Sequence, residues 1–136
     1  MKELKKILVV DDDTDILAIV KMTLSKNSSF DVLTLDSGKK AIDEVERFQP
    51  DFILLDVMMP EIDGLSTLKI LRTIPSAKNI AVAFFTAKVT QDEISSYTEY
   101  GVAGVIIKPF SPIDLSQQII KLWTDHQKVV EEKNHG

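Results

Sequence analysis

Short apolar runs alternate along the chain with longer stretches in which apolar residues recur every three or four positions. The runs are bounded by polar, Gly or Pro residues and predict five strands, at residues 7–10, 31–35, 52–55, 80–85 and 102–107. The periodic stretches predict five helices, near residues 16–24, 41–48, 65–71, 91–100 and 115–122. The predicted order is therefore a strand followed by a helix, repeated along the whole chain.

The third run, Phe-Ile-Leu-Leu at residues 52–55, is apolar throughout and does not alternate with polar residues. Continuous apolar strands are typical of parallel sheets that helices cover on both faces. We therefore expect an α/β fold, namely a flavodoxin-like three-layer (βα)5 sandwich whose five-stranded parallel sheet has the order 2-1-3-4-5. Ligands of such sheets bind outside the carboxyl ends of the strands, where the strand order reverses.

Composition and length suit one compact domain. The chain has 136 residues, of which 44% are hydrophobic and 27% are charged. The apolar pattern fades after Trp123, so we expect the domain to span residues 1–126 and residues 127–136 to be a flexible tail or the start of a linker. Thr90 with Glu93, and Ser111 with Pro112, predict the starts of the last two helices.

Charge and residue usage exclude several classes of function. A formal net charge of -5 disfavours direct nucleic-acid binding, which needs clustered Lys and Arg. No stretch approaches the roughly 20 apolar residues of a membrane helix, and the apolar run at 7–10 is too short for a signal segment. The absence of cysteine excludes disulfides and thiol chemistry and fits a cytoplasmic protein.

Polar side chains follow four of the predicted strands at their carboxyl ends. They are Asp11, Asp12 and Asp13 after the first strand, Asp56 after the third, Thr86 after the fourth and Lys108 after the fifth. Neighbouring strands lie about 4.8 Å apart, so Asp56 lies beside the acids of the first strand and Lys108 can reach back toward them. Each residue taken alone has an ordinary explanation, such as helix capping by Asp13. Only their joint placement indicates a site.

The donor set of this cluster points to a metal and to phosphorus chemistry. Several adjacent carboxylates raise one another's pKa unless a cation offsets their charge. Oxygen ligands without His or Cys favour Mg²⁺, and residues 11–14 lack the spacing of a calcium-binding loop. A carboxylate beside such a metal can attack phosphorus and form an acyl phosphate. The metal and Lys108 would offset charge on the transferring oxygens, and Thr86 would donate a hydrogen bond.

Four segments carry a family resemblance: ILVVDDD at 7–13, PDFILLDVMMPEIDG at 50–64, FFTA at 84–87 and VIIKPF at 105–110. With their spacing, they resemble the receiver domains of bacterial two-component response regulators, a family that includes chemotaxis regulators. The resemblance covers residues 5–124. It implies a signalling phosphoacceptor that takes a phosphoryl group from the phosphohistidine of a sensor histidine kinase or a histidine phosphotransfer protein. It also implies that the domain catalyses its own phosphorylation and dephosphorylation, and switches an output surface that a downstream protein can bind.

The resemblance also implies a role for each site residue. Asp56 is the phosphoacceptor, Asp12 a direct Mg²⁺ ligand, Asp11 an acid that holds a water of the metal, and Met58 a ligand through its backbone carbonyl. By the same resemblance, Thr86 is the switch hydroxyl and Lys108 binds the phosphoryl group, with a cis peptide bond between Lys108 and Pro109.

One departure from the family pattern concerns the switch. Val105 stands three residues before the lysine, where the family usually has Tyr or Phe. Two tyrosines, Tyr97 and Tyr100, stand in the fourth predicted helix, where small residues are common. The acceptor chemistry does not depend on these positions, but the usual joint movement of the threonine and an aromatic ring does. Either tyrosine could supply the missing ring.

Three other functions compete with this reading. A phosphohydrolase of the haloacid-dehalogenase type needs an acid two residues after its nucleophile, where this chain has Met58. A flavin-binding module needs a phosphate-cradling loop after the first strand, where this chain has three aspartates. The strongest alternative is a degenerate receiver that acts only as a protein-binding module, although all the expected site residues are present.

Overall fold

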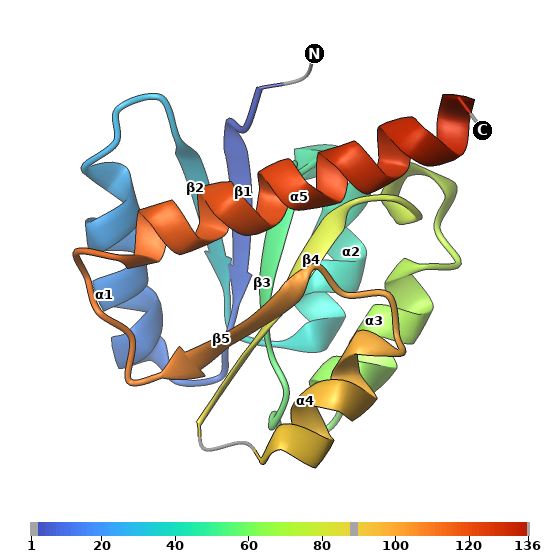
Figure 1. Ribbon diagram of the computed structural model, residues 1–136. Coiled ribbons are helices and arrows are strands. Elements are labelled where there is room, and N and C mark those ends of the chain that lie inside the picture. The colour runs from blue at the N-terminus through green and yellow to red at the C-terminus, as the bar shows by residue number, and fades with distance from the viewer. Residues whose placement is uncertain (1–2, 88–89, 136) are drawn as a thin grey trace.

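The computed structural model describes residues 3–87 and 90–135, in which five strands alternate with five α-helices (Figure 1). The strands are β1 (Lys6–Val10), β2 (Asp31–Leu35), β3 (Phe52–Asp56), β4 (Ala81–Ala87) and β5 (Gly104–Lys108). The helices are α1 (Thr14–Ser25), α2 (Gly38–Phe48), α3 (Gly64–Leu71), α4 (Gln91–Thr98) and α5 (Leu115–His135), with a short 3-10 helix, η1 (Pro75–Ala77), before β4. The predicted alternation is confirmed.

The five strands form one parallel sheet in the order β2-β1-β3-β4-β5, as predicted from the sequence. Adjacent strands end almost level: Val10 of β1 pairs with Leu55 of β3, and Ala87 of β4 pairs with Lys108 of β5. The order reverses between β1 and β3, which are neighbours in the sheet although β2 separates them in the sequence. The fold therefore gathers the residues that follow β1, β3, β4 and β5 at one edge.

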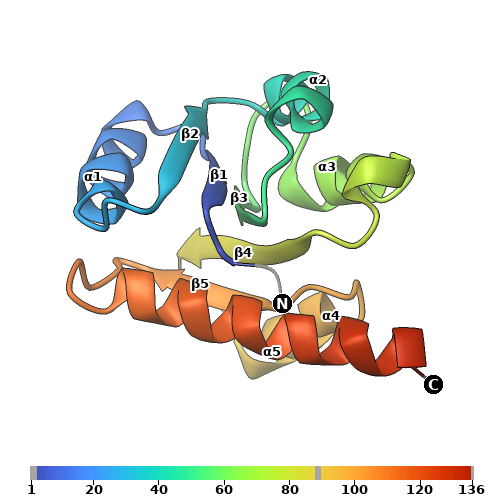
Figure 2. The same ribbon diagram turned by 90° about the horizontal axis from the view of Figure 1, so that it is seen from above.

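Alternate residues of each central strand point to opposite faces of the sheet and belong to two separate cores. In β1, Ile7 and Val9 pack with apolar side chains of α1 and α5, whereas Leu8 and Val10 pack with those of α2 and α3. Figure 2 shows α2 and α3 on the opposite side of the sheet from α5. Both faces of the sheet are covered, which explains the continuously apolar strands.

Local capping explains where several helices begin. The Asp13 side chain accepts hydrogen bonds from the backbone N–H groups of Asp15 and Ile16, and the Thr90 hydroxyl accepts one from the N–H of Glu93. The last helix departs from the expectation, since α5 begins at Leu115 and the residues after Ser111 form turns. Its proline therefore lies in the turn before the helix.

The last helix also extends further than the sequence pattern predicts. The periodic pattern predicts a helix near residues 115–122, but α5 continues to His135. An ion pair between Lys121 and Asp125 links successive turns at 2.9 Å, and the His126 Nε2 atom lies 2.9 Å from the carbonyl oxygen of Asn79. These contacts lie around residue 125, where the apolar stripe weakens. The domain boundary expected at residue 126 thus falls within a helix, and it stays a prediction.

None of the helices in the described part of the chain is both long enough and apolar enough to cross a membrane.

Candidate functional site

Three carboxylates meet where β1 and β3 end. Asp11 directly follows β1, Asp56 is the last residue of β3, and the exposed Asp12 stands beside them. One carboxylate oxygen from each of these three residues can be chosen so that all three lie within 4.8 Å of one another. They line a pocket of about 300 Å³ together with Asp13, Ile16, Met58, Thr86, Ala87 and Lys108. The structure therefore brings together every site residue predicted from the sequence.

Lys108, the last residue of β5, reaches across the sheet edge into this pocket. Its Nζ atom lies 2.7 Å from Oδ2 of Asp11 and 3.4 Å from Oδ1 of Asp56. The same ammonium lies over the ring of Phe85, 4.8 Å from the ring centroid. The peptide bond to Pro109 is cis, as the family resemblance implies. The lysine thus contacts both buried acids from β5, at the edge of the sheet.

The pocket raises the pKa of both Asp56 and Lys108, but for different reasons. Burial, followed by the negative charge of Asp11, raises the pKa of Asp56 from 3.8 to about 7, and the charge of Lys108 offsets only part of this rise. Burial acts to lower the pKa of Lys108, but the hydrogen bond and the charge of Asp11, and then the charge of Asp56, outweigh it and raise that pKa. The lysine is therefore charged at neutral pH, while the pocket still has an excess of negative charge.

The negative charge of the carboxylate cluster and the type of its ligand atoms decide whether it fits a divalent cation. The three carboxylates of the cluster, with Asp13 beside them, face a single ammonium among the described residues of the pocket, so acidic groups outnumber cations there. The ligand atoms are oxygens, and the exposed Asp12 keeps one side of the cluster open to water. Hard oxygen donors with room for retained waters suit Mg²⁺ better than a softer metal. The donor set therefore fits the magnesium site predicted from the sequence.

Thr86 lies in β4 on the same edge and is buried. Its hydroxyl donates a hydrogen bond to the carbonyl oxygen of Ala87 at 3.3 Å, a bond within its own strand. In the register of the sheet, Asp56 pairs with Phe85, the residue before Thr86. Thr86 is thus one residue beyond the level of Asp56 in the sheet, and it lines the same pocket.

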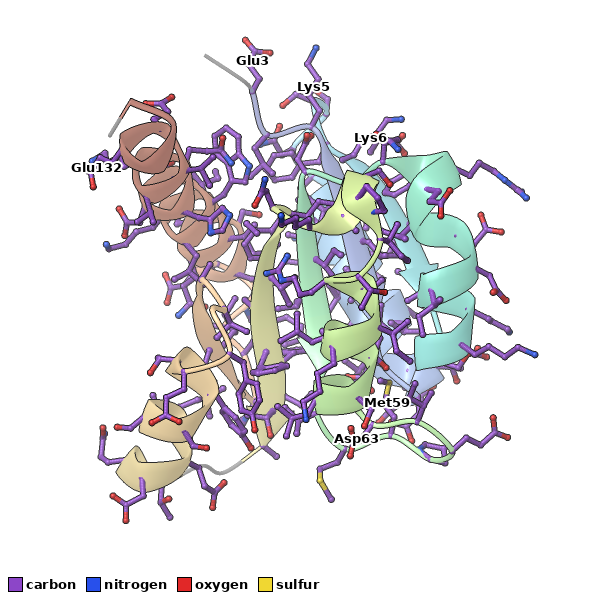
Figure 3. The ribbon with its side chains drawn as sticks, turned by 90° about the vertical axis from the view of Figure 1, so that its right-hand side faces the viewer. Glu3, Lys5, Lys6, Met59, Asp63 and Glu132 are labelled. Atoms are coloured by element: carbon purple, nitrogen blue, oxygen red, sulfur yellow. The ribbon has the colours of Figure 1, made fainter. Side chains whose placement is uncertain are left out.

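The loop after β3 holds the acid end of the pocket in place. Met58 is 77% exposed at the pocket mouth, whereas Met59 is buried in the core beneath α2 and α3. Figure 3 shows Met59 and Asp63 at this end of the molecule, far from the labelled N-terminal residues at the other end. The Asp63 side chain caps α3 by accepting a hydrogen bond from the N–H of Ser66 at 2.8 Å.

Gly64 is a supporting residue that the sequence analysis did not single out. Its N–H donates a hydrogen bond to the carbonyl of Val57 at 2.9 Å, and a Cβ atom here would collide with the backbone carbonyl oxygen of Asp56. Only glycine lets α3 begin so close to the end of β3. The Asp-Gly pair at residues 63–64 was the available signal, because it marks a cap followed by a close backbone approach.

The predicted replacement for the missing aromatic ring has a structural counterpart. The ring of Tyr97 packs edge-on against Phe84 of β4, with centroids 5.1 Å apart and planes at 66°. Val105, which pairs with Phe84 in the sheet, packs against the same core from β5. Tyr100 is more exposed and lies under the ammonium of Lys69. Of the two tyrosines, Tyr97 is the one that contacts the strand carrying Thr86.

Comparison with known proteins agrees with this geometry. Residues 7–120 match the family model of the response regulator receiver domain. The chain is 35% identical over 115 residues to the alkaline phosphatase synthesis transcriptional regulatory protein PhoP of Bacillus subtilis. It is 30% identical over 115 residues to the DNA-binding response regulator MtrA of Mycobacterium tuberculosis. These matches cover 85% of this chain but 47% and 49% of those proteins, so the chain spans about half the length of these relatives.

Solved structures of isolated receivers match along nearly their whole length. The chemotaxis protein CheY4 of Vibrio cholerae superimposes with a TM-score of 0.81 at 26% identity, over 88% of this chain and 99% of that one. The receiver domain of the Francisella response regulator 1452 superimposes with a TM-score of 0.79 at 30% identity, over 89% of this chain and 98% of that one. The chain therefore belongs to the response regulator receiver domain family, the phosphoryl-accepting signalling domains of two-component systems.

Proposed function

We propose that Asp56 is the residue of this receiver that accepts the phosphoryl group, and that it does so with Mg²⁺ held by the three-carboxylate cluster. The observation that carries the proposal is the convergence of Asp11, Asp12 and Asp56 with the ammonium of Lys108 in one pocket. Asp11 and Lys108 are held by each other, and the exposed Asp12 is turned to water. Asp56 is thus the buried carboxylate best placed to face both a metal and a phosphodonor.

In the transfer step, a carboxylate oxygen of Asp56 attacks phosphorus. The bond between phosphorus and the donor nitrogen of a phosphohistidine breaks, its electron pair stays on the imidazole, and an acyl phosphate forms on Asp56. Mg²⁺ would be held directly by Asp12, Asp56 and the carbonyl of Met58, and by Asp11 through a water, and when bound it would neutralise charge on the phosphoryl oxygens. Lys108 binds a phosphoryl oxygen through its ammonium, which already lies 3.4 Å from Asp56.

The phosphoryl group is removed from Asp56 by hydrolysis within the same pocket. Water attacks phosphorus, the bond between phosphorus and the Asp56 oxygen breaks, and the carboxylate and inorganic phosphate are released. The 77% exposed Met58 at the mouth controls how water approaches. The chain thus catalyses both its own phosphorylation and its own dephosphorylation, and it is a phosphoacceptor in signalling.

The switch follows from a change of partner by the Thr86 hydroxyl. In the unphosphorylated pocket this hydroxyl bonds to the carbonyl of Ala87, and a phosphoryl oxygen on Asp56 offers a stronger, charged acceptor. Movement of Thr86 transmits to Phe84 along β4 and from there to the Tyr97 ring that packs on it. Tyr97 takes the role of the aromatic side chain that the family usually has at the position of Val105.

Receiver domains act with histidine kinases, and the phosphodonor of this chain is the phosphohistidine of a sensor kinase or of a histidine phosphotransfer protein. The target of the switch is a protein surface, because a net charge of -5 disfavours direct contact of this chain with DNA. The DNA-binding role in the name of MtrA belongs to that protein. A cytoplasmic location stays a prediction from the sequence.

A phosphorylation assay with matched variants tests the proposal. The purified chain is incubated with acetyl phosphate and Mg²⁺, and its intact mass is measured with and without a chelator. We expect the mass of one added phosphoryl group when Mg²⁺ is available, and no added mass when the chelator is present throughout the incubation or when Asp56 is replaced by Asn. Asp36→Asn, which changes an exposed carboxylate, serves as the control and labels normally. Labelling of Asp56→Asn would contradict the assignment, and no labelling of the unmodified chain would favour a degenerate, protein-binding receiver.

A further inference from the structure

A second cavity lies at the opposite end of the sheet from the acidic pocket. It has a volume of about 560 Å³, within the range of small-molecule sites. Residues after α3, the loop before β5 and the last turns of α5 enclose it. Figure 1 shows these three segments close together near the C-terminal end of α5. The extension of α5 that the sequence pattern did not predict therefore forms one wall of this cavity.

The apolar part of the lining comes from two segments. Val102 lies in the loop before β5, and Val129 and Val130 lie on α5, with Val129 48% exposed. The ring of Tyr100 stands at the border and is also partly exposed. Covering these exposed apolar side chains with an apolar ligand group is more favourable than leaving them in contact with water.

Arg72 supplies the main polar group. Its Nη1 atom donates hydrogen bonds to the backbone carbonyls of Ala77, Lys78 and Ile80 at 3.2, 3.2 and 2.7 Å. These bonds fix the plane of the guanidinium. Among the described residues, its Nε and Nη2 atoms have no hydrogen-bond acceptor, although Arg72 lines the cavity. A guanidinium held in this way, with Nε and Nη2 left without an acceptor, can bind a carboxylate through two parallel hydrogen bonds.

The other charges around the cavity leave it cationic. The exposed Lys78 adds a second positive charge at the rim. The one carboxylate in the lining, that of Asp125, is paired with Lys121 at 2.9 Å, outside the cavity. His126 is engaged with the carbonyl of Asn79 through Nε2. The chain as a whole has a net charge of -5. This cavity differs from it, because Arg72 and Lys78 are its cations and Asp125 is already paired.

We propose that this cavity is a binding site for a small amphipathic carboxylate, an organic acid whose apolar part lies against Val102, Val129 and Val130. The carboxylate contacts the Nε and Nη2 edge of Arg72, and Lys78 approaches it from the rim. Inorganic phosphate fits poorly, since it leaves the apolar wall uncovered and offers no planar pair of oxygens. Because this cavity and the acidic pocket lie at opposite ends of the strands, both can be occupied at once.

Binding of a defined probe tests the proposal. The ¹⁵N-labelled chain is titrated with 3-phenylpropionate, and amide shifts are followed by NMR. We expect saturable shifts at Gly101, Val102 and Ala103 with a Kd of about 1 mM, typical of a probe of this size. Three matched probes separate the contributions: 3-phenylpropionamide lacks the charge, acetate lacks the apolar part, and inorganic phosphate has a different anion. Each should bind at least about tenfold more weakly.

Variants locate the site independently of the probes. Arg72→Lys keeps a positive charge but loses the planar edge, and should weaken 3-phenylpropionate about tenfold. Val129→Asp changes an exposed residue, so the fold is kept, and should weaken binding at least as much by placing a like charge on the wall. Lys26→Gln, on the far side of the molecule, is the control and should bind normally. Equal binding of the amide or of phosphate, or shifts unaffected by both variants, would overturn the proposal, as would the absence of any shift.

Discussion

Replacing Asp56 by Asn should stabilise the metal-free protein at alkaline pH. Asp56 is only 4% exposed, and it lies next to Asp11, so its ionised form is costly in the folded state without a metal. Asn has nearly the same shape and carries no charge. The substitution therefore removes an unfavourable charge while it keeps the packing at the end of β3. A residue placed there for chemistry, at a cost in stability, is expected to behave in this way.

The magnitude follows from the pKa of Asp56, which is raised from 3.8 to about 7. A difference of about three units, at about 1.4 kcal/mol each, gives an upper value of about 4 kcal/mol. The pKa of about 7 already includes the attraction to Lys108, and water at the open pocket mouth reduces the cost of the charge, so we expect a gain of about 1–3 kcal/mol. The folded state binds this proton more tightly than the unfolded state. The native protein therefore loses stability as the pH rises from about 4 to about 7, and the gain of the variant appears over the same window.

Urea unfolding, followed through the single buried tryptophan, Trp123, measures the effect. The free energy of unfolding of both proteins is compared in chelator at about pH 5 and about pH 8. The advantage of Asp56→Asn should be larger at the higher pH, and saturating Mg²⁺ should reduce or reverse it, because the native site binds the metal better. Asp36→Asn is the control, because the hydrogen bond and charge of Lys40 lower the pKa of this exposed carboxyl. If Asp56→Asn is no more stable than the native chain at about pH 8 without metal, the electrostatic account of the pocket is wrong.

Three further predictions concern single residues around the site. Asp12→Ala should weaken Mg²⁺ binding at least about tenfold and leave stability almost unchanged, because Asp12 is exposed; equal Mg²⁺ affinity by calorimetry would remove it from the ligand set. Gly64→Ala should destabilise the fold by about 2–3 kcal/mol in urea unfolding, since its Cβ would meet the Asp56 carbonyl, and a neutral result would refute that close contact. Tyr97→Ala should cost about 1–2 kcal/mol and reduce the spectral difference between the free chain and the chain with beryllofluoride, whereas Tyr97→Phe should do neither. An undiminished difference in the alanine variant would exclude Tyr97 from the switch.

The sheet and its functional edge could be predicted from the sequence because they depend on local signals. Continuous apolar runs fix which segments are strands, and the residue after each run must lie at the common edge of a parallel sheet. Asp56 and Lys108 are 52 residues apart in the sequence, yet both were placed at this edge from strand ends alone. The strand ends themselves were shifted by a residue or two, because Asp56, Thr86 and Lys108 belong to the strands.

Features that depend on contacts between distant segments could not be predicted. In the extended part of α5, His126 contacts the carbonyl oxygen of Asn79, and no periodicity along the helix reveals this contact. The sequence also left open which tyrosine would replace the missing ring, and the packing of Tyr97 on Phe84 favours one of them. Arg72 carried no signal, because its role is defined by three backbone carbonyls whose positions follow from the turn after α3.

The central claim is that the acyl phosphate forms on Asp56, and direct mapping of the modified residue tests it. Phosphorylated protein is reduced with borohydride, which converts an aspartyl phosphate to homoserine, and proteolytic peptides are sequenced by mass spectrometry. The account predicts homoserine at residue 56, formed only with Mg²⁺ and phosphodonor present. Homoserine at Asp11 or Asp12 with none at Asp56 would contradict it.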